Sequence, residues 1–465
     1  KGVSKREFIT VCSSHSEGNP AKEVSYYQEK AFCLWLAWDL QIYPSKSLIR
    51  IIFATRNAVG LGGSIMNHTS TFFTLLKGVE VFAPEKLGRQ DLLIAGDKIA
   101  AIGPQLEVPS GCNCQIIDLS KYTAVPGFID GHVHMIGGGG EGGYATRTPE
   151  VQLGDVVRAG VTTVVGCLGT DGTTRHMTAL LAKARGLEAE GVSTYIYTGS
   201  YEVPTNTITR NVRDDIILID KVIGCGEIAI SDHRSAQPTK EDIAKLAAES
   251  RIGGMLSGKA GLLHLHVGDG KNKLSMLFDI VGEGEIPITQ FLPTHISRNK
   301  ALLDDGVRFA AMGGTIDITA GSLKSPGKNA AIKPSDAVMY CLENGVPLSN
   351  ITMSSDGNGS MPAFNEEGKL VGLEVAKMDT LYQDIRELIV EKRLKLEEAI
   401  RIITENPAKT LKLHPQKGCL QVGADADIVI LDKDLNIHHV FAKGKIMLYD
   451  KKQMAFGTFE KRNAG

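Results

Sequence analysis

The chain has 465 residues, which is more than one small hydrophobic core can organise and suits a large catalytic domain with a smaller one. Its content of 43% hydrophobic and 22% charged residues is that of an ordinary globular protein. The formal net charge of -2 gives no electrostatic case for binding nucleic acid or an anionic membrane, so we expect a small-molecule substrate.

Cysteine usage favours a reducing compartment. The chain has eight cysteines, and only Cys112 and Cys114 lie close together, which is not the pattern of a disulfide framework. We therefore expect a cytoplasmic protein. The apolar run at residues 31–40 contains Asp39 and is shorter than the roughly 18 residues that a membrane span needs, so we expect no membrane partner.

Residues 1–65 show neither sustained helical nor strand periodicity, and they precede the first methionine, Met66. Their glutamates argue against an acid-poor transit peptide. We expect this stretch to be an extension, disordered or artefactual, that lies outside the folded domains.

Short strand-like runs occupy both ends of the remaining chain. Residues 98–102 follow a Gly-Asp turn, and similar runs return near the C-terminus. The two ends are predicted to form one small β-sandwich domain from residues 66–124 and 415–465. The predicted strands are 72–75, 79–81, 91–94, 98–102, 115–118, 427–431, 438–442 and 445–447.

Between these ends, apolar strands that finish in polar residues alternate with helical segments. This α/β rhythm predicts a (β/α)₈ TIM barrel over residues 125–414. The strands should end near His134, Thr170, Tyr201, Ser231, His266, His295, Thr319 and Asp356. Helices are expected at 148–159, 174–190, 239–251 and 300–311, with another at 396–405 after the barrel.

His132 and His134 share one face of a strand, because alternate side chains point the same way. Such a pair is weak evidence alone, but further metal-binding side chains follow at the expected strand ends. Six groups exceed what one tetrahedral zinc ion uses, so two ions sharing a carboxylate are predicted. The predicted ligands are His132, His134, Glu227, His266, His295 and Asp356. His264 lies one barrel layer deeper, so we expect it to be a structural residue behind the ligands.

Four motifs together resemble the metal-dependent amidohydrolase superfamily, most closely its isoaspartyl dipeptidases, and the resemblance covers residues 72–460. They are Gly-Phe-Ile-Asp-Gly-His-Val-His at 127–134, Ser-Asp-His-Arg-Ser at 231–235, Leu-Pro-Thr-His at 292–295 and Ser-Ser-Asp-Gly-Asn-Gly-Ser at 354–360. The resemblance implies a homo-oligomeric zinc enzyme that hydrolyses β-aspartyl dipeptides with a metal-bridging hydroxide. It also implies that Asp356 takes the proton of that hydroxide and that Tyr201 donates to the oxyanion.

One position departs from the familiar pattern of this superfamily, in which a carbamylated lysine on the fourth strand bridges the metals. Glu227 stands there in this chain, and Lys221 lies six residues earlier, too far along the strand to reach the same point. We expect Glu227 to bridge two Zn²⁺ ions directly.

A β-aspartyl dipeptide carries one ammonium and two carboxylates around the bond to be cut. Glu141 suits the ammonium, and the guanidinium groups of Arg234 and Arg298 suit the carboxylates. Hydrogen bonds are expected from a further set: Gly139, Thr170 and Ser360.

Other activities share this scaffold, and the fold alone does not choose among them. Hydantoinases, dihydroorotases and N-acyl-amino-acid deacylases are the alternatives within enzymes, and Glu141, Tyr201 and Arg234 discriminate against them. A non-catalytic homologue is disfavoured, because a residue able to bind metal fills every expected ligand position.

We predict that residues 1–65 are dispensable, because no barrel or sandwich pattern precedes Met66. A chain that starts at Met66 should fold and retain its metal, as checked by circular dichroism and metal analysis. Aggregation of that chain with all barrel ligands intact would show that the segment is structural.

Overall fold

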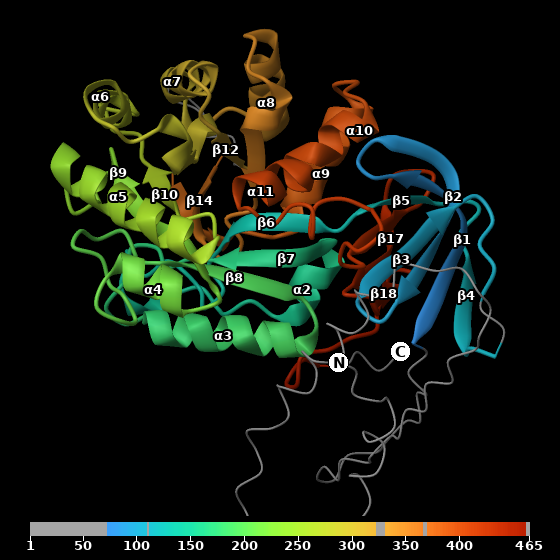
Figure 1. Cartoon of the computed structure of the whole chain (residues 1–465). Helices are drawn as coiled ribbons and strands as arrows, with labels where there is room; N and C mark the ends of the chain where they lie inside the picture. Colours follow the sequence, from blue (N-terminus) through green and yellow to red (C-terminus); the bar gives the residue numbers. More distant parts are fainter. Residues whose placement is uncertain (1–71, 109–110, 322–330, 366–369, 462–465) are drawn as a thin grey trace, which may run out of the picture. The chain divides into compact units, whose positions relative to one another are not determined.

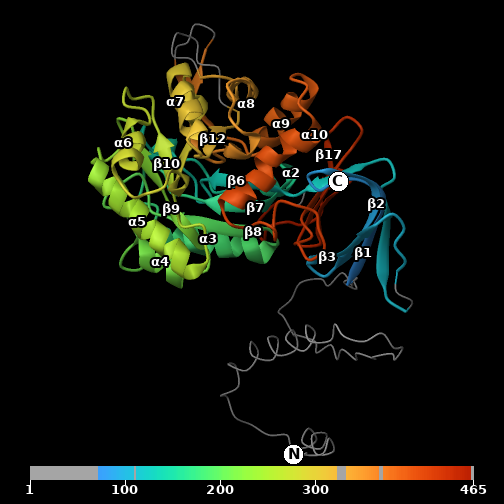
Figure 2. The ribbon, with the colours of Figure 1, turned by 45° about the horizontal axis from the view of Figure 1, so that its top comes forward.

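The computed structural model describes residues 72–108, 111–321, 331–365 and 370–461, which belong to one compact unit. The extension predicted at residues 1–65 lies outside the described residues. Within the described part, strands from both chain ends lie beside a large barrel, as the blue and red ribbons of Figures 1 and 2 show.

Eight parallel strands form the barrel. Six of them make one sheet in the order β11-β10-β9-β8-β7-β6, and β12 pairs with β13. A parallel bridge between Val133 and Gly357 brings the last strand back to the first. The predicted (β/α)₈ barrel is therefore confirmed. The strands are β6 (Phe128–Val133), β7 (Val161–Gly166), β8 (Ser193–Thr198), β9 (Val222–Ile230), β10 (Leu262–Val267), β11 (Phe291–Thr294), β12 (Ile316–Thr319) and β13 (Ile351–Ser354).

Helices cover the outside of the barrel, so its strands are buried on both faces and carry near-continuous apolar runs such as that of β9 (Figure 1). The helix at 300–311 has the bounds that the sequence predicts, since the Asn299 side chain caps it by accepting from the backbone N–H of Leu302. The barrel helices are α2 (Leu153–Arg158), α3 (Met177–Glu190), α4 (Val212–Leu218), α5 (Lys240–Ser257), α6 (Ser275–Glu283), α7 (Lys300–Ala311), α8 (Pro334–Glu343) and α9 (Thr380–Val390).

Two predicted helices differ from the structure. The helix expected at 148–159 begins only at Leu153, because the backbone N–H groups of Thr148 and Val151 bond to the loop that follows β6. The helix expected at 396–405 is broken into α10 (Leu396–Ala399), a 3₁₀ turn (Ile400–Ile403) and α11 (Glu405–Thr410). Pro407 has no N–H to donate and is tolerated here in the first turn of α11.

Both chain ends build one nine-stranded sheet in the order β19-β18-β17-β16-β5-β1-β2-β3, with β4 beside β1. An isolated bridge from Lys98 to Asp425 brings the β3 edge back toward β16, and an apolar core fills the inside. Gly78, at φ +67°, makes a bulge that joins two predicted strands into β1. The strands are β1 (Phe73–Phe82), β2 (Lys86–Ala95), β3 (Lys98–Gly103), β4 (Cys114–Asp118), β5 (Thr123–Pro126), β16 (Ile428–Leu431), β17 (Ile437–Ala442), β18 (Lys445–Tyr449) and β19 (Lys452–Gln453). A separate hairpin pairs β14 (Ser360–Phe364) with β15 (Leu370–Val375).

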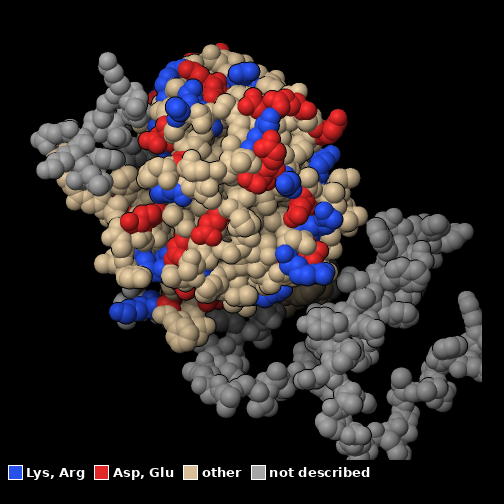
Figure 3. Space-filling view, turned by 90° about the vertical axis from the view of Figure 1, so that its left-hand side faces the viewer, with Lys and Arg blue, Asp and Glu red and all other residues tan. Residues whose placement is uncertain are grey.

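The surface of the described part carries both signs of charge. On the face drawn in Figure 3, basic and acidic side chains are interspersed, and no broad area has one sign. No helix among the described residues is long and apolar enough to cross a bilayer.

A buried lysine joins the end sheet to the barrel. The Nζ atom of Lys417 lies 2.6 Å from Oδ2 of Asp425 and 2.5 Å from Oδ2 of Asp427, and it donates to Oγ of Ser193 on β8 at 2.6 Å. The lysine side chain is 2% exposed, so its charge is compensated by these neighbours and not by water.

We predict that Lys417→Met destabilises the protein by about 3–5 kcal/mol, because it leaves two buried carboxylates without their cation. Denaturant unfolding measures the change. Lys433→Met is the matched control, since that side chain is 84% exposed, and it should change the free energy of unfolding by no more than about 0.5 kcal/mol. Equal effects of the two substitutions would contradict the role assigned to Lys417.

Candidate metal centre

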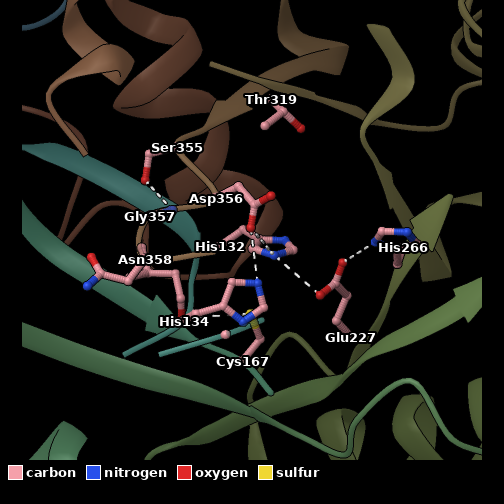
Figure 4. A network of polar contacts seen from close by, with 12 residues as sticks. His132, His134, Cys167, Glu227, His266, Thr319, Ser355, Asp356, Gly357 and Asn358 are labelled. Carbon is pink, nitrogen blue, oxygen red and sulfur yellow. Dashed lines mark hydrogen bonds and ion pairs between the residues drawn. The ribbon is translucent and has the colours of Figure 1, made fainter. Parts of the chain in front are cut away.

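The predicted metal ligands meet at the carboxyl ends of the barrel strands, where barrel enzymes place their active sites (Figure 4). His132 lies on β6 and His134 directly follows it, Glu227 lies on β9 and His266 on β10. The four side chains are almost entirely buried. Two more residues complete the set, His295 after β11 and Asp356 after β13.

One group of side chains surrounds His132. The Nε2 atom of His132 lies 3.4 Å from Oε2 of Glu227 and 3.4 Å from Oδ1 of Asp356, and Nε2 of His134 lies 3.0 Å from the same Asp356 oxygen. The Cys167 thiol adds a further potential ligand beside His132, His134 and Glu227.

A second group lies on the other side of the same carboxylate. Oε1 of Glu227 is 2.8 Å from Nδ1 of His266 and 3.2 Å from Nε2 of His295. The two groups therefore share Glu227, which is the arrangement expected of a bridging ligand.

Three unsatisfied atoms fit a cation. Each atom is buried and has no hydrogen-bond partner among the described residues: they are His132 Nε2, Glu227 Oε2 and Asp356 Oδ1. The His132 nitrogen lies 3.4 Å from each of the two oxygens. Buried polar atoms without partners are costly, and two carboxylate oxygens with an imidazole nitrogen make a donor set that metal ions accept. These side chains are able to hold metal.

The charge state of Glu227 agrees with such a role. Burial opposes its ionisation, but the imidazoles of His132 and His266 hold the pKa of the carboxyl well below its usual range. Glu227 is thus a carboxylate at neutral pH, able to bind cations through both oxygens.

Backbone geometry at the barrel seam places Asp356. The backbone N–H of Ser355 donates to Oδ1 of Asp130 on β6 at 3.1 Å, and the backbone N–H of His134 donates to the carbonyl of Gly357 at 2.8 Å. Asp356 and His295 both adopt left-handed backbone conformations, at φ 53° and 65°, which are uncommon for residues other than glycine. Such strain is typical of functional positions held by their surroundings.

On the open side of the centre, Glu141 and Arg234 meet each other. Oε1 of Glu141 accepts from Oγ1 of Thr170 at 2.9 Å and from Nη1 of Arg234 at 3.2 Å. Gly139, Glu141 and Thr170 also line one cavity of about 240 Å³, together with Tyr144 and Arg147. Three of the six predicted substrate-binding residues thus share one cavity, and Arg234 contacts one of them, Glu141.

The other predicted substrate-binding residues lie nearby with less defined partners. A Cβ atom built on Gly139 would lie 3.0 Å from Cβ of Ser360, so these residues are adjacent. Arg298 lies three residues after His295, and its Nε atom is buried without a hydrogen-bond partner in the described part of the chain. This nitrogen is free to meet a ligand.

Similarity to known proteins agrees with this geometry. The model of the amidohydrolase family matches residues 123–447. This chain belongs to the amidohydrolase family. The resemblance read from the sequence motifs is confirmed.

Three known proteins are similar to this chain over different shares of its length. The crystal structure of a beta-aspartyl dipeptidase from Fervidobacterium islandicum AW-1, in complex with a beta-Asp-Leu dipeptide, is 45% identical, with a TM-score of 0.77 over 84% of this chain and 99% of that one. The dihydroorotase of Lactiplantibacillus plantarum is 23% identical over 78% of this chain and 89% of its own. An L-hydantoinase of Paenarthrobacter aurescens matches at 52% over 44 residues, only 10% of either chain.

Sequence reasoning missed two residues of this amidohydrolase centre. Cys167 follows β7, and its Sγ lies 3.9 Å from Nδ1 of His134. Asp232 accepts from Nε and Nη2 of Arg234 at 3.0 and 2.8 Å and lies 2.8 Å from Nε2 of His266. Asp232 directly follows the predicted strand end at Ser231, and Cys167 precedes the one at Thr170 by three residues. Their positions beside predicted strand ends could therefore have marked them.

Lys221 does not approach the metal centre. It precedes β9, and its Nζ pairs with Oε1 of Glu188 at 2.6 Å. Six residues of strand separate it from Glu227, roughly 20 Å. A bridging role for this lysine would need a different register of β9.

We predict that Glu227→Gln lowers the metal content per chain, because an amide lacks the charge that both groups share. Metal analysis after dialysis measures this. Glu188→Gln, a change of the same size at the Lys221 pair, should leave metal content unchanged. Metal-free wild-type protein should also reload with zinc in buffer depleted of carbon dioxide, and a strict bicarbonate requirement would contradict the direct bridge.

Proposed function

We propose that this amidohydrolase is a metal-dependent dipeptidase that hydrolyses β-aspartyl dipeptides. The observation that carries the proposal is 45% identity over 99% of a beta-aspartyl dipeptidase whose structure holds β-Asp-Leu. The charged residues beside the metal centre match the charges of such a substrate, which supports the same proposed activity.

We propose two Zn²⁺ ions: His132, His134 and Asp356 would hold one, His266 and His295 would hold the other, and Glu227 would contribute to both. When bound, such ions lower the pKa of a coordinated water and polarise the scissile carbonyl. The remaining chemistry falls to side chains of the chain itself.

Asp356 is proposed to accept the proton of the attacking water and to pass it to the leaving amine. It faces His132 and His134 with one oxygen that has no hydrogen bond in the described structure. Burial opposes its ionisation, but these two imidazoles hold the pKa of the carboxyl well below its usual range, so it is an ionised carboxylate at neutral pH, the state that a proton acceptor needs.

Tyr201 is proposed to donate a hydrogen bond to the oxyanion that forms on the substrate carbonyl. Burial, and after it the negative charge of Glu227, raises the pKa of the hydroxyl well above its usual value. The hydroxyl therefore keeps its proton at neutral pH. Its oxygen lies 2.7 Å from Nδ1 of His266, which places it at the edge of the second group of ligands.

Recognition is proposed to depend on three charges. Glu141 would bind the substrate ammonium, while Arg234 and Arg298 would bind its two carboxylates. Gly139, Thr170 and Ser360 would add hydrogen bonds. A hydantoin or dihydroorotate lacks the free ammonium that Glu141 is proposed to bind, which weighs against a cyclic-amide hydrolase.

We also propose that the enzyme is a cytoplasmic homo-oligomer without nucleic acid or membrane partners. The support is its cysteine usage, its mixed surface charge and its family resemblance. The six cysteines of the described structure are all free thiols, as a reducing compartment would keep them.

We predict that Arg234→Ala lowers kcat/KM for β-Asp-Leu by at least about ten- to a hundredfold, the equivalent of one charge-assisted hydrogen bond of roughly 1.5–3 kcal/mol. Zinc content should not change, because a guanidinium is not a ligand. Arg210→Ala, at an 88% exposed side chain, is the control and should keep full activity.

The same assay compares β-Asp-Leu with α-Asp-Leu, hydantoin and dihydroorotate. An α-linked dipeptide places its ammonium and first carboxylate differently around the scissile carbonyl, so it should be cut poorly. A wild-type preference for either cyclic amide, or normal hydrolysis of β-Asp-Leu by Arg234→Ala, would refute the proposed recognition.

A further inference from the structure

His264 lies on β10, two residues before His266 and one layer deeper in the barrel, and it is 1% exposed. Both of its ring nitrogens have partners. Nε2 lies 2.8 Å from Nδ1 of His132, and Nδ1 lies 3.0 Å from the backbone carbonyl oxygen of Leu292. The ring is stacked on Tyr197, with centroids 4.8 Å apart.

The direction of these hydrogen bonds follows from what each partner can do. A carbonyl oxygen only accepts, so Nδ1 of His264 carries a proton and donates to Leu292. A charged imidazole at this depth would be uncompensated, since its two hydrogen-bond partners are a carbonyl and another imidazole. His264 is therefore neutral, and its Nε2 accepts from Nδ1–H of His132.

The consequence falls on the other nitrogen of His132. With Nδ1–H engaged by His264, Nε2 is the nitrogen of His132 that is left to bind metal, and this is the atom that lies 3.4 Å from both Glu227 and Asp356. A histidine that binds metal commonly donates its second N–H to a neighbour that fixes its tautomer and orientation.

We propose that His264 is a positioning residue that fixes the tautomer and ring orientation of His132, and so preorganises the metal site that His132 forms with His134. Two hydrogen bonds thus link the Leu292 carbonyl on β11 to His132 through the ring of His264. The position of β11 therefore affects the orientation of His132 at the metal centre. This inference rests on the metal centre of the proposed function but not on its substrate.

Three substitutions of His264 and one of Tyr197 separate this role from packing. In His264→Gln the amide oxygen reaches the place of Nε2 and can still accept from His132. In His264→Asn the shorter amide reaches only the place of Nδ1, so it keeps the contact with Leu292 and loses His132. His264→Leu removes both contacts, and Tyr197→Phe keeps the stacked ring as a control for the surroundings.

The experiment titrates the zinc-loaded full chain with a competing chelator and follows the zinc that remains per chain. His264→Asn and His264→Leu should bind one of the two ions about ten- to a hundredfold more weakly, while His264→Gln and Tyr197→Phe stay close to wild type. Wild-type affinity in His264→Asn, or a loss in His264→Gln as large as in His264→Asn, would overturn the proposal.

A second measurement needs no variant. Long-range ¹H–¹⁵N spectra of the zinc-loaded wild-type protein should show the proton of His264 on Nδ1 and none on its Nε2, and a proton on Nε2 of His264 would overturn the assignment. Failure of the wild-type protein to bind any zinc would instead refute the proposed metal-dependent function itself.

Discussion

Glu227 is fully buried, and its two oxygens face His132 on one side and His266 and His295 on the other. A carboxylate in such a place costs several kcal/mol to remove from water, so it persists only where donors or cations converge on it. The imidazoles among these groups come from neighbouring strand ends. Two come from the end of β6, one from β10 and one from the residue after β11. Much of the barrel's carboxyl face can be understood as the compensation of this one charge.

The barrel, and the convergence of the six predicted ligand residues at one end of it, could be predicted from sequence because both depend on local periodicity. Alternation along β6 places His132 and His134 on one face, and the cap at Asn299 fixes the start of α7. The helix expected at 396–405 is interrupted by the 3₁₀ turn Ile400–Ile403 and by Thr404, whose backbone is not helical at φ -130° and ψ -84°, and apolar periodicity does not register such a break. Residues 1–65 and the domain boundaries stay predictions.

Contacts between strands distant in the chain could not be predicted in the same way. Asp232 holds both Arg234 and His266, and the pairing of Arg234 with Glu141 joins residues 93 positions apart. The sequence assigned Arg234 and Glu141 to separate charges of a substrate and had no means of showing that they contact each other. That information lies in the closure of the barrel, which brings loops after different strands together.

The pair between Glu141 and Arg234 has an effect on which molecules can enter. In the free protein Glu141 pairs with Arg234, which Asp232 also holds, and the side chains of Glu141 and Arg234 are only 33% and 27% exposed. A simple carboxylate that binds Arg234 in place of Glu141 leaves Glu141 without its cation, whereas a zwitterion also supplies an ammonium to Glu141. If the cavity binds substrate as proposed, the pair would favour dipolar ligands over anions that carry a single charge.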